Sequence, residues 1–459
     1  MHKPLRGVIA LTSLVLTGMS AQGQIADITH QEIQDAVRYP TSGGPIDGKY
    51  AYAWGSYTCN IGDAPLLWQN AGTPALAMNA YRLHDGRMMQ IGLGFAKHAC
   101  CVANGSGCGT CQAGPAGTLR PGCRDIYSAS FNGGQGRLGP RSGINAYDTT
   151  FSTIPSGTGD ALWRRVQVTL ADMDAVGFAG ARYFAEGVYV CAEETFAQSI
   201  NNATYRPMNV ANTGATPTYA WSVTGASATG KPAIVAWQEH GLGLNIPDPD
   251  VKVVITDIPD EGRFYAAGKV RDLSGTGAGP WRYDYAVFNL NSHRSGSSFS
   301  VPVPSGANLT DIGFHAPDYH SGEPYDNTDW SATRCYSSLT WRSPADFATN
   351  PNTNALRWGT MYNFWFTADV PPSPSLGIAT LGLFRPGSVP SIEANGLPVV
   401  STPDCPSDFN ASGQTTVQDI FDFVEAFFDN RAVTDMNCNG AITVQDLFDY
   451  FELYYTPCN

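Results

Sequence analysis

The sequence contains little positive charge. Only 27 of its 459 residues are Lys or Arg, against 40 Asp and Glu, and its formal net charge is −13. A chain with so few basic residues offers no broad positive field for a phosphate backbone or for anionic lipid. The composition therefore argues against nucleic acid and membrane surfaces as partners.

Several signatures of common enzyme classes are also missing. The sequence has no nucleophile elbow, no zincin helix and no phosphate-binding P-loop. Beyond the N-terminal apolar run, no stretch reaches the roughly 18 apolar residues that a membrane-spanning helix needs. The sequence therefore predicts neither a membrane span nor one of these well-defined catalytic motifs.

The N-terminus has the pattern of an export signal. Lys3 and Arg6 precede an apolar run from Val8 to Leu16, and Ala21-Gln22-Gly23 supplies small residues for cleavage. We interpret residues 1–23 as a signal peptide and expect a secreted protein, extracellular or at the cell surface. Cysteines in such an oxidising environment are expected to form disulfides.

Residues 24–400, here called the body, predict a β-rich exported domain. The chain contains 49 Gly and 31 Pro, so long helices should be scarce. Short apolar runs between turn residues are typical of an antiparallel sandwich, and the length allows one or two sandwiches with long loops and a division into two subdomains. The alternation over 281–289 predicts a strand buried mainly on one face. We also expect a strand over 233–238 and short helices over 29–37 and 192–200.

Cysteines are concentrated in one part of the body. The chain has 11, so at least one is free or joined to another chain, and five lie between residues 100 and 123. The spacing Cys108-Gly-Thr-Cys111 also occurs in zinc and redox sites. Export favours disulfide staples over both of these alternatives.

One stretch of the body gathers residue types that are suited to catalysis. The weak candidates between residues 293 and 323 are His293, His315, Asp318, His320 and Glu323. Imidazole and carboxylate groups ligate metals or act as acid and base, but this spacing matches no motif with a mechanism. Neighbouring Trp and Tyr residues suit either the core or stacking on sugar rings.

The strongest signal is a repeated loop in the C-terminal residues 404–459, here called the tail, which carry ten acidic residues and one basic residue. Asp408, Asn410, Ser412, Thr416 and Asp419 occupy positions 1, 3, 5, 9 and 12 of a loop with Gly413 at position 6, and the pattern recurs 27 residues later, from Asp435 to Asp446. This is the spacing with which an EF-hand-type loop surrounds Ca²⁺ with oxygen atoms. Two copies in register favour calcium binding over an ordinary turn motif.

Each loop is followed by a predicted helix with two apolar stripes. The first stripe contains Val417, Phe421, Val424 and Phe428, matched by Val444, Phe448, Phe451 and Tyr455. The second contains Ile420, Phe423 and Phe427, matched by Leu447, Tyr450 and Tyr454. Two helices bury one stripe in their mutual contact. The other is then left for the body or a partner protein, unless the small tail needs both stripes for its own core.

The duplicated Asp-x-Asn-x-(Ser/Asn)-Gly loop, which ends in Asp and precedes a helix, resembles a type I dockerin module. The motif Val-Gln-Asp-(Ile/Leu)-Phe-Asp at the start of each helix is similar to that in modules of secreted planctomycete proteins. The resemblance covers the tail and implies two Ca²⁺ ions held by the side chains of Asp408, Asn410, Ser412 and Asp419, by those of Asp435, Asn437, Asn439 and Asp446, and by the backbone carbonyls of Gln414 and Ala441. It implies partner contacts through Val417, Gln418, Val444 and Gln445, with a cohesin-like or other cell-surface protein as the partner.

The resemblance also bears on the cysteines and on affinity. The ends of such a module lie close together, so we expect a disulfide between Cys405 and Cys458. Cys438 would then be unpaired, as a free thiol or as an intermolecular link. Ser412 and Asn439 stand where Asp is common, so each loop brings two carboxylates and the sites should be weak, with a Kd on the order of 10⁻⁴ M or above.

The sequence thus favours a secreted protein that is attached through its calcium-binding tail to a partner or a cell-surface assembly. Dockerin modules usually accompany domains that bind or break down polysaccharides, so a polysaccharide is the expected ligand of the body. The body itself resembles only an uncharacterised exported domain. Two alternatives stay open, namely a glycoside hydrolase acting on O-glycosyl bonds and an architectural cell-surface protein.

Overall fold

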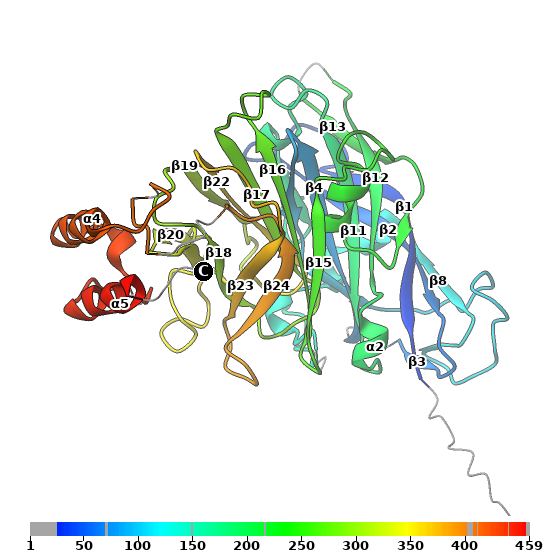
Figure 1. Cartoon of the computed structure of the whole chain (residues 1–459). Helices are drawn as coiled ribbons and strands as arrows, with labels where there is room; N and C mark the ends of the chain where they lie inside the picture. The colour runs from blue at the N-terminus through cyan, green and yellow to red at the C-terminus, as the bar shows by residue number, and fades with distance from the viewer. Residues whose placement is uncertain are drawn as a thin grey trace, which may run out of the picture.

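In the computed structural model, the described residues are 25–68, 72–147, 150–214, 217–401, 407–410, 412–438 and 440–455. They form a mainly β structure of several antiparallel sheets, and two longer helices, α4 and α5, lie at one end of the molecule (Figure 1). The prediction of a mainly β protein is confirmed. The predicted signal peptide lies outside the described residues. None of the helices in the described ranges is long and apolar enough to cross a membrane.

Four large sheets make up the body. The first contains β1 (Ile28–Tyr39), β2 (Lys49–Asn60), β8 (Arg124–Tyr127) and β10 (Val166–Thr169). The second contains, in order, β13 (Tyr219–Val223), β12 (Ala203–Asn212), β11 (Arg182–Val190), β4 (Gly72–His84), β6 (Ala96–Ala99) and β9 (Leu138–Gly139), with β5 (Arg87–Leu93) beside β4 and β14 (Ala228–Thr229) beside β12.

The third sheet contains, in order, β15 (Lys252–Ile258), β16 (Gly262–Asp272), β17 (Trp281–Asn289), β22 (Thr360–Ala368) and β19 (Leu309–His315). The fourth contains β20 (Ser331–Arg334), β21 (Ser338–Arg342), β18 (Gly296–Pro302), β23 (Gly377–Leu383) and β24 (Ser391–Leu397). A small fifth sheet pairs β3 (Leu66–Leu67) with β7 (Thr118–Leu119).

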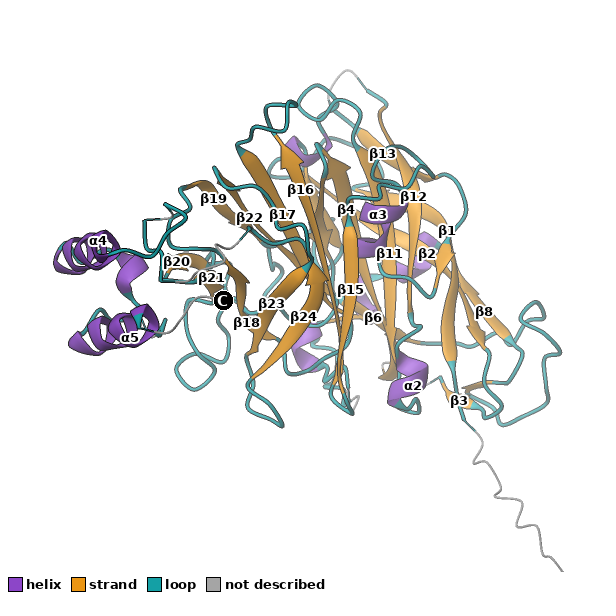
Figure 2. Cartoon of the chain, in the orientation of Figure 1, coloured by secondary structure: helices purple, strands orange, loops and turns teal. Residues whose placement is uncertain are grey.

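The four large sheets are stacked in layers, with a hydrophobic cluster between each successive pair (Figure 2). Alternation along the strands produces this stacking. On β4, Leu76 and Met78 face the first sheet, whereas Ala77 and Tyr81 face the third. The second and third sheets are therefore covered on both faces.

This layering corrects the prediction for residues 281–289. They form β17 as expected, but the strand is buried on both faces. Tyr285 packs toward the fourth sheet, while Asp284 and Phe288 are 0% exposed on the opposite side. The reason lies in the tertiary structure. The second sheet covers the face of β17 whose mixed polar and apolar residues predict exposure to solvent.

Two local predictions were wrong. Residues 29–37 lie in β1, which pairs with β2 and has register shifts between His30 and Glu32 and between Ile33 and Ala36. Such bulges move the side-chain alternation, so the buried residues of the strand acquire a spacing that suggests a helix.

Conversely, residues 233–238 form a 3-10 turn (Ala233–Val235) and the start of α3 (Ala236–Glu239) instead of a strand. Ala236 and Trp237 of this segment pack into the core between the second and third sheets. In the segment 192–200, only α2 (Phe196–Ser199) is helical.

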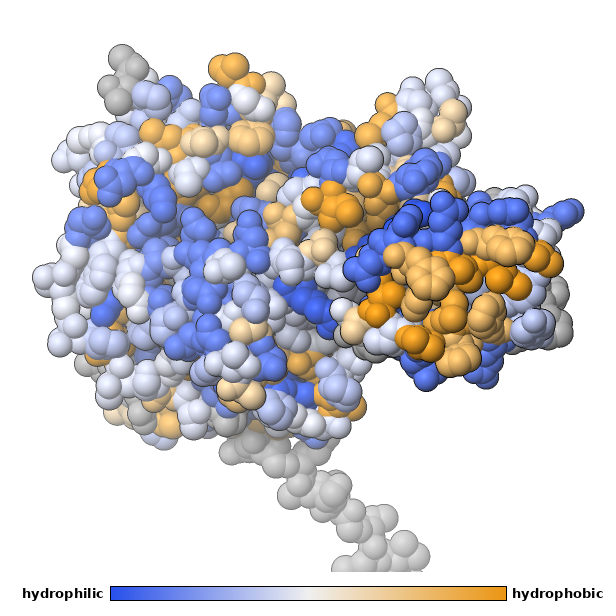
Figure 3. Space-filling model, turned by 90° about the vertical axis from the view of Figure 1, so that its left-hand side faces the viewer, coloured by the Kyte–Doolittle hydropathy of each residue, from blue (hydrophilic) through white to orange (hydrophobic). Residues whose placement is uncertain are grey.

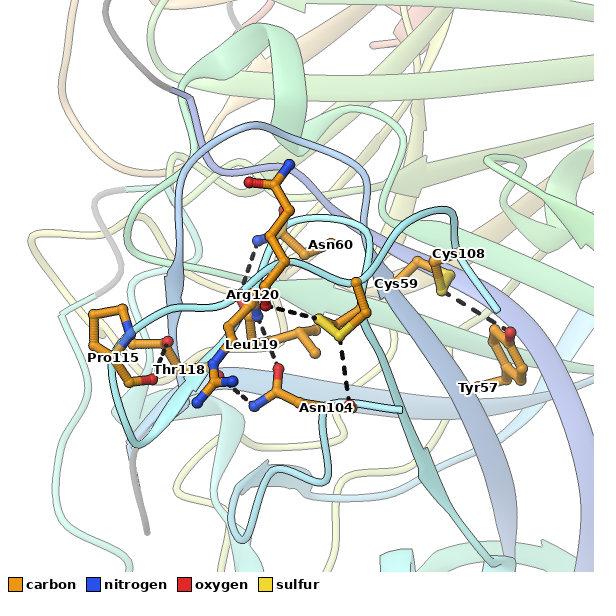
Figure 4. Close-up of a disulfide and its surroundings, with 12 residues drawn as sticks. Tyr57, Cys59, Asn60, Asn104, Cys108, Pro115, Thr118, Leu119 and Arg120 are labelled. Carbon is orange, nitrogen blue, oxygen red and sulfur yellow. Dashed lines mark hydrogen bonds between the residues drawn. A yellow bond between two sulfur atoms is a disulfide. The ribbon is translucent and has the colours of Figure 1, made fainter. Parts of the chain in front are cut away.

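Disulfides staple the cysteine-rich segment, as predicted. Cys59 pairs with Cys108, Cys100 with Cys101, and Cys111 with Cys123. The two cysteines of the Cys108-Gly-Thr-Cys111 spacing thus serve different disulfides, which contradicts a zinc or redox pair. Asn104 adds hydrogen bonds to the carbonyl of Thr118 (2.9 Å) and from the backbone N–H of Arg120 (3.0 Å), as Figure 4 shows.

Among the described cysteines, Cys191 alone is a free thiol. It is buried, and this burial raises the pKa of the thiol well above its usual value. Cys191 is therefore a protonated core residue of low reactivity.

Candidate functional site

The two predicted helices of the tail are present and begin directly after the two acidic loops. They are α4 (Val417–Phe428) and α5 (Val444–Tyr454), and a capping box opens each one. The Asp419 carboxylate accepts the backbone N–H of Thr416 (2.7 Å), and Asp446 accepts that of Thr443 (2.8 Å). Each loop-closing Asp therefore also fixes the start of its helix.

Hydrogen bonds from backbone N–H groups hold the acidic side chains so that they point into the loops. Asp408 accepts the N–H of Ser412 (2.9 Å) and that of Gly413 (2.6 Å), and Asp419 also accepts the N–H of Asn410 (3.2 Å). In the second loop the corresponding carboxylate, Asp435, accepts the N–H of Gly440 (2.8 Å).

Glycine is required at position 6 of both loops. Gly413 has φ +87° and Gly440 has φ +86°, a backbone conformation that side chains disfavour. The sequence repeat thus corresponds to a repeat in backbone geometry.

The acidic side chains of the loops are buried. Asp408 is 2% exposed, and Asp419 and Asp446 are 0% exposed. None of these three carboxylates forms an ion pair with Lys or Arg within the described part of the chain. Burial tends to raise the pKa of Asp446, but hydrogen bonds from the backbone of Thr443, Asn437 and Met436 outweigh it and lower this pKa. Asp446 is therefore charged at neutral pH.

A hard, oxygen-seeking cation fits this environment. Buried carboxylates without a basic partner are costly unless a cation compensates their charge. No group of three or more His, Cys, Asp or Glu side chains in the described residues is arranged so that it could hold a metal ion, and each loop supplies only two carboxylates. The remaining expected donors are amide, hydroxyl and carbonyl oxygens, and Asn439 lies outside the described residues.

The two helices pack one apolar stripe against each other and expose most of the other. The rings of Phe423 and Tyr450, from the second stripe, stack at 4.0 Å between centroids and form the centre of the tail core. Six residues of the first stripe are 60–79% exposed, and we call them the outer stripe: Val417, Phe421, Phe428, Val444, Phe448 and Tyr455. Figure 3 shows this apolar patch on the outward surface of the tail.

The predicted partner-binding residues lie at the edge of the outer stripe. Val417 and Val444 are both 60% exposed. Gln418 donates to Asp422 and Gln445 donates to Asp449, each at 2.7 Å. The two helices thus present equivalent side chains at this edge.

The expectation that Cys438 is unpaired is wrong, because it forms a disulfide with Cys335 of the body. The neighbouring Tyr336 enters the tail core, where its ring stacks on Phe409 at 6.3 Å between centroids. Its backbone N–H also donates to the carbonyl of Asp435 (3.1 Å). The tail is therefore held at a defined place on the body. Cys405 and Cys458, the expected pair, lie outside the described residues.

A polar pocket on the body brings together three of the five weak catalytic candidates. His315, Asp318 and His320 line a cavity of about 270 Å³, here called the histidine pocket. Its other polar lining residues are Lys49, Gln90, Gln167, Thr169, Asp172 and Asp329. Most of these lie far away in the sequence, on β2, β5 and β10 or beside β10, and no local pattern marks them.

His320 has a structural role in this pocket. Its Nε2–H donates to the carbonyl of Leu93 (2.8 Å), and its Nδ1 lies 3.1 Å from the amide nitrogen of Gln167 and 2.8 Å from the hydroxyl of Ser321. Burial lowers its pKa to about 4, so the ring is neutral. Both ring nitrogens are engaged, which leaves His320 no free group for metal or proton transfer.

His315 retains a chemically available nitrogen. Its Nε2–H donates to the carbonyl of Gln90 (2.9 Å), so Nδ1 is the acceptor nitrogen of the neutral ring. Burial lowers the pKa of His315 below its usual value, and charges on Asp172 and Asp318 oppose this effect. His315 is thus the histidine of the pocket that is suited to accept a hydrogen bond or a proton.

The other two candidates lie elsewhere. Glu323 is buried and accepts the backbone N–H groups of Arg141 (3.1 Å) and Ser142 (2.7 Å), and burial raises its pKa. Arg141 in turn donates to the carbonyls of Gly94 (2.7 Å) and Gly359 (2.8 Å), which joins the second and third sheets. His293 lies in the turn between β17 and β18, outside the lining of the histidine pocket. The five candidates therefore do not form one site.

The tryptophans near these candidates are mainly core residues. Trp330, Trp341 and Trp358 are at most 3% exposed. They belong to the hydrophobic clusters between sheets and offer no stacking surface to a sugar ring.

No family model matches the sequence, and no curated protein matches it in a sequence comparison.

The neutral His320 predicts an acid-sensitive contribution to stability. Its pKa is about 4 in the folded protein against 6.5 for an ordinary histidine, so the unfolded chain binds more protons between these values. This contribution is complete above pH 6.5 and is lost as the pH falls toward 4. Because the ring is partly solvent-exposed, we expect a loss of about 2 kcal/mol. Urea unfolding at pH 7 and pH 4.5 should show a loss that is larger by this amount in the wild type than in His320→Gln, which keeps the buried His30 and its similarly lowered pKa; equal losses in both would contradict it.

Proposed function

We propose that this exported β protein is attached, through a calcium-dependent helical tail, to a partner protein at the cell surface, and that its body binds polysaccharide. The observation that carries the attachment is the pairing of two buried acidic loops with an exposed apolar stripe on the helices that they start. The resemblance of the tail to dockerin modules points to a cohesin-like partner.

Calcium would compensate the buried negative charge of the tail. One ion would be held by Asp408, Asn410, Ser412, Asp419 and the carbonyl of Gln414. The second would be held by the equivalent residues Asp435, Asn437, Asn439, Asp446 and the carbonyl of Ala441. Bound Ca²⁺ supplies positive charge that these loops otherwise lack, so ion binding and the order of the loops are coupled. The closing Asp residues carry this coupling into the first turns of α4 and α5.

The outer stripe sets the chemistry of the partner surface. Its apolar side chains are bordered by acidic residues on the same helices, including Asp422, Asp429, Asp449 and Glu452. Complementary interfaces place apolar groups opposite apolar groups and opposite charges at the rim. The expected partner surface is thus an apolar patch edged by Lys or Arg.

Polysaccharide binding by the body is supported by the histidine pocket. Amides, carboxylates and an imidazole converge there, and such groups recognise the hydroxyls of a sugar. A glycoside hydrolase acting on O-glycosyl bonds is the second candidate, because Asp172, Asp318 and Asp329 line the same pocket. Sugar release that disappears in Asp172→Asn or Asp318→Asn would favour hydrolysis. Retention on polysaccharide without release would favour binding, and neither result would favour an architectural role.

Substitution of the outer stripe should remove attachment. We expect Phe421→Glu combined with Phe448→Glu to weaken calcium-dependent binding of the labelled full-length protein to the exporting cells by at least about 30-fold, because exposed aromatic side chains often dominate an interface. Binding isotherms with and without chelator measure this effect.

Val176→Glu is the matched control, since Val176 is 88% exposed on the body and undergoes the same change in chemistry. Far-UV circular dichroism verifies that α4 and α5 persist in the double variant. Unchanged binding of the double variant, or equal weakening in Val176→Glu, would refute attachment through the outer stripe.

A further inference from the structure

A second pocket of the body gathers positive charge. Four arginines, Arg82, Arg87, Arg271 and Arg282, line a cavity of about 330 Å³, here called the arginine pocket. They come from the four strands β4, β5, β16 and β17, so both central sheets contribute. In a chain of net charge −13 with only 27 basic residues, such a concentration is unexpected.

The acidic partners of these arginines differ in burial. The Asp284 side chain is 0% exposed. It accepts hydrogen bonds from Arg87 Nε (2.7 Å), Arg271 Nη2 (3.3 Å) and Arg282 Nε (3.4 Å). One buried carboxylate thus organises three guanidinium groups.

The remaining carboxylates lie at the edges of the pocket. Asp85 pairs with Arg271 and Asp311 with Arg282, but the two side chains are 73% and 66% exposed, so water screens them. Arg82 pairs with Asp172, which lines the histidine pocket instead. Four carboxylates thus pair with the four arginines, but of these four only Asp284 is fully buried, so the partners of the other charges lie at the rim.

Aromatic rings restrain the guanidinium groups of the pocket, and some of their N–H groups are left free to donate to a ligand. Arg87 and Arg282 lie over the ring of Trp365, at 4.1 and 5.7 Å from its centroid, and Arg82 lies 3.4 Å from that of Phe178. Such contacts restrict the guanidinium planes before binding. Within the described part of the protein, Arg87 Nη1 and Arg282 Nη2 have no hydrogen-bond acceptor.

We propose that the arginine pocket binds an anionic substituent of an acidic polysaccharide, namely the carboxylate of a uronic acid or a sulfate ester. Planar guanidinium groups match the oxygens of both substituents, and the remaining donors would pair with them. This inference rests on the proposed polysaccharide binding by the body.

The position of the pocket favours a polysaccharide over a small free anion. β5 contributes Arg87 to the arginine pocket and Gln90 to the histidine pocket, and β19 contributes Asp311 to the former and His315 to the latter. The Arg82–Asp172 pair (2.9 Å) joins the linings of the two pockets. Neighbouring sugar units of one chain would thus place a charged group on the arginines and hydroxyls in the histidine pocket.

Calorimetric titration of the full-length protein with dextran sulfate, polygalacturonate and neutral dextran tests the proposal. We expect at least about 10-fold tighter binding of one acidic polymer than of dextran, and the acidic polymer that binds identifies the substituent. Arg282→Gln should weaken this binding about 10-fold, as expected for the loss of one charge-assisted hydrogen bond. Arg342→Gln, which removes an exposed arginine of β21 outside the pocket, should change it little.

A second variant protects the test against misfolding. Arg87→Lys keeps a cation beside Asp284 but removes the planar donors, and it should also weaken binding. Equal affinity for acidic and neutral polymers, unchanged binding by both pocket variants, or equal weakening by Arg342→Gln would overturn the proposal. Binding of a single-stranded DNA oligonucleotide as tightly as the acidic polysaccharide would overturn it as well, because the site would then select charge alone.

Failure of the inference and failure of the proposed function give different results. If the arginine variants bind polysaccharide as tightly as the wild type, the proposed function of the body is retained. The proposal that the arginine pocket binds an anionic substituent is then refuted. If no polysaccharide binds, stabilisation by inorganic sulfate in the wild type but not in Arg282→Gln would keep an anion site and refute the polysaccharide. Absence of both effects would refute both.

Discussion

The full-length protein should bind two calcium ions and should lose both when Asp408, Asp419, Asp435 and Asp446 are replaced by Asn. Only two carboxylates serve each loop, so the expected Kd is on the order of 10⁻⁴ M or weaker, and loss of both carboxylates should abolish measurable binding. Isothermal titration calorimetry gives the stoichiometry and affinity. Replacing only Asp408 and Asp419 should leave one ion bound, since the loops are separate.

Calcium removal should also loosen the tail. Without a cation, the carboxylates of Asp408 and Asp419 are buried in a segment whose one base is Arg431, and uncompensated buried carboxylates destabilise the loop that precedes α4. Far-UV circular dichroism should lose helical signal on chelation and regain it when calcium is added.

Asp429→Asn is the control, because Asp429 is an exposed acid at the end of α4 and lies outside both loops. This variant should bind calcium as the wild type does. A wild type that shows no heat of calcium binding, or a variant with all four Asp residues replaced that still binds two ions, would refute the proposed calcium sites.

Removal of the Cys335–Cys438 disulfide should have the second large effect. The bond joins residues that are 103 positions apart, and a constraint on a loop of about that length is worth roughly 2–5 kcal/mol. We expect the double variant Cys335→Ser/Cys438→Ser to lower the free energy of tail unfolding by this amount. The reason is that Tyr336 then docks into the tail core without a covalent link beside it.

Differential scanning calorimetry in calcium-containing buffer should show an earlier transition for the tail and an unchanged transition for the sheets of the body. The double variant Cys111→Ser/Cys123→Ser is the matched control, since it removes a disulfide of separation 12 in the cysteine-rich segment. It should leave the tail transition in place. If both double variants left that transition unaltered, the bond would not hold the tail.

The disulfide also changes how attachment should be pictured. Cys438 lies inside the second acidic loop, so the bond connects a proposed calcium site directly to the edge of the fourth sheet. A partner bound to the outer stripe would therefore hold the body in a restricted orientation. A tail joined only through residues 398–407 would give no such restriction.

The sequence predicted what depends on neighbours along the chain. The 27-residue repeat, Gly413 and Gly440 at position 6, and the Thr and Asp residues of the capping boxes were all readable from spacing. Spacing also indicated two apolar stripes on each helix, one of them for the contact between the helices, but not which stripe would be buried. The strand over residues 281–289 was readable as well, since alternation between turn residues is also local.

The long-range pairings could not be read in this way. The stapling of the cysteine-rich segment was predictable from the expected export and from the close spacing of its cysteines, but the partner of Cys438 lies 103 residues away and no pattern marks it. Bulges in β1 gave its apolar residues a spacing like that of a helix. In β17, the face with mixed polar and apolar residues is buried because the second sheet covers it.

By itself, then, the sequence determined a mainly β chain of low positive charge with a repeated acidic, helix-forming end. The tertiary structure alone decided that His315 faces residues of distant strands, and that three arginines from three strands contact the buried Asp284 in an acidic protein. The physical reason is that spacing and periodicity encode contacts within a turn or a strand. Which sheets stack, and which side chains then meet, depends on the burial of all the layers together.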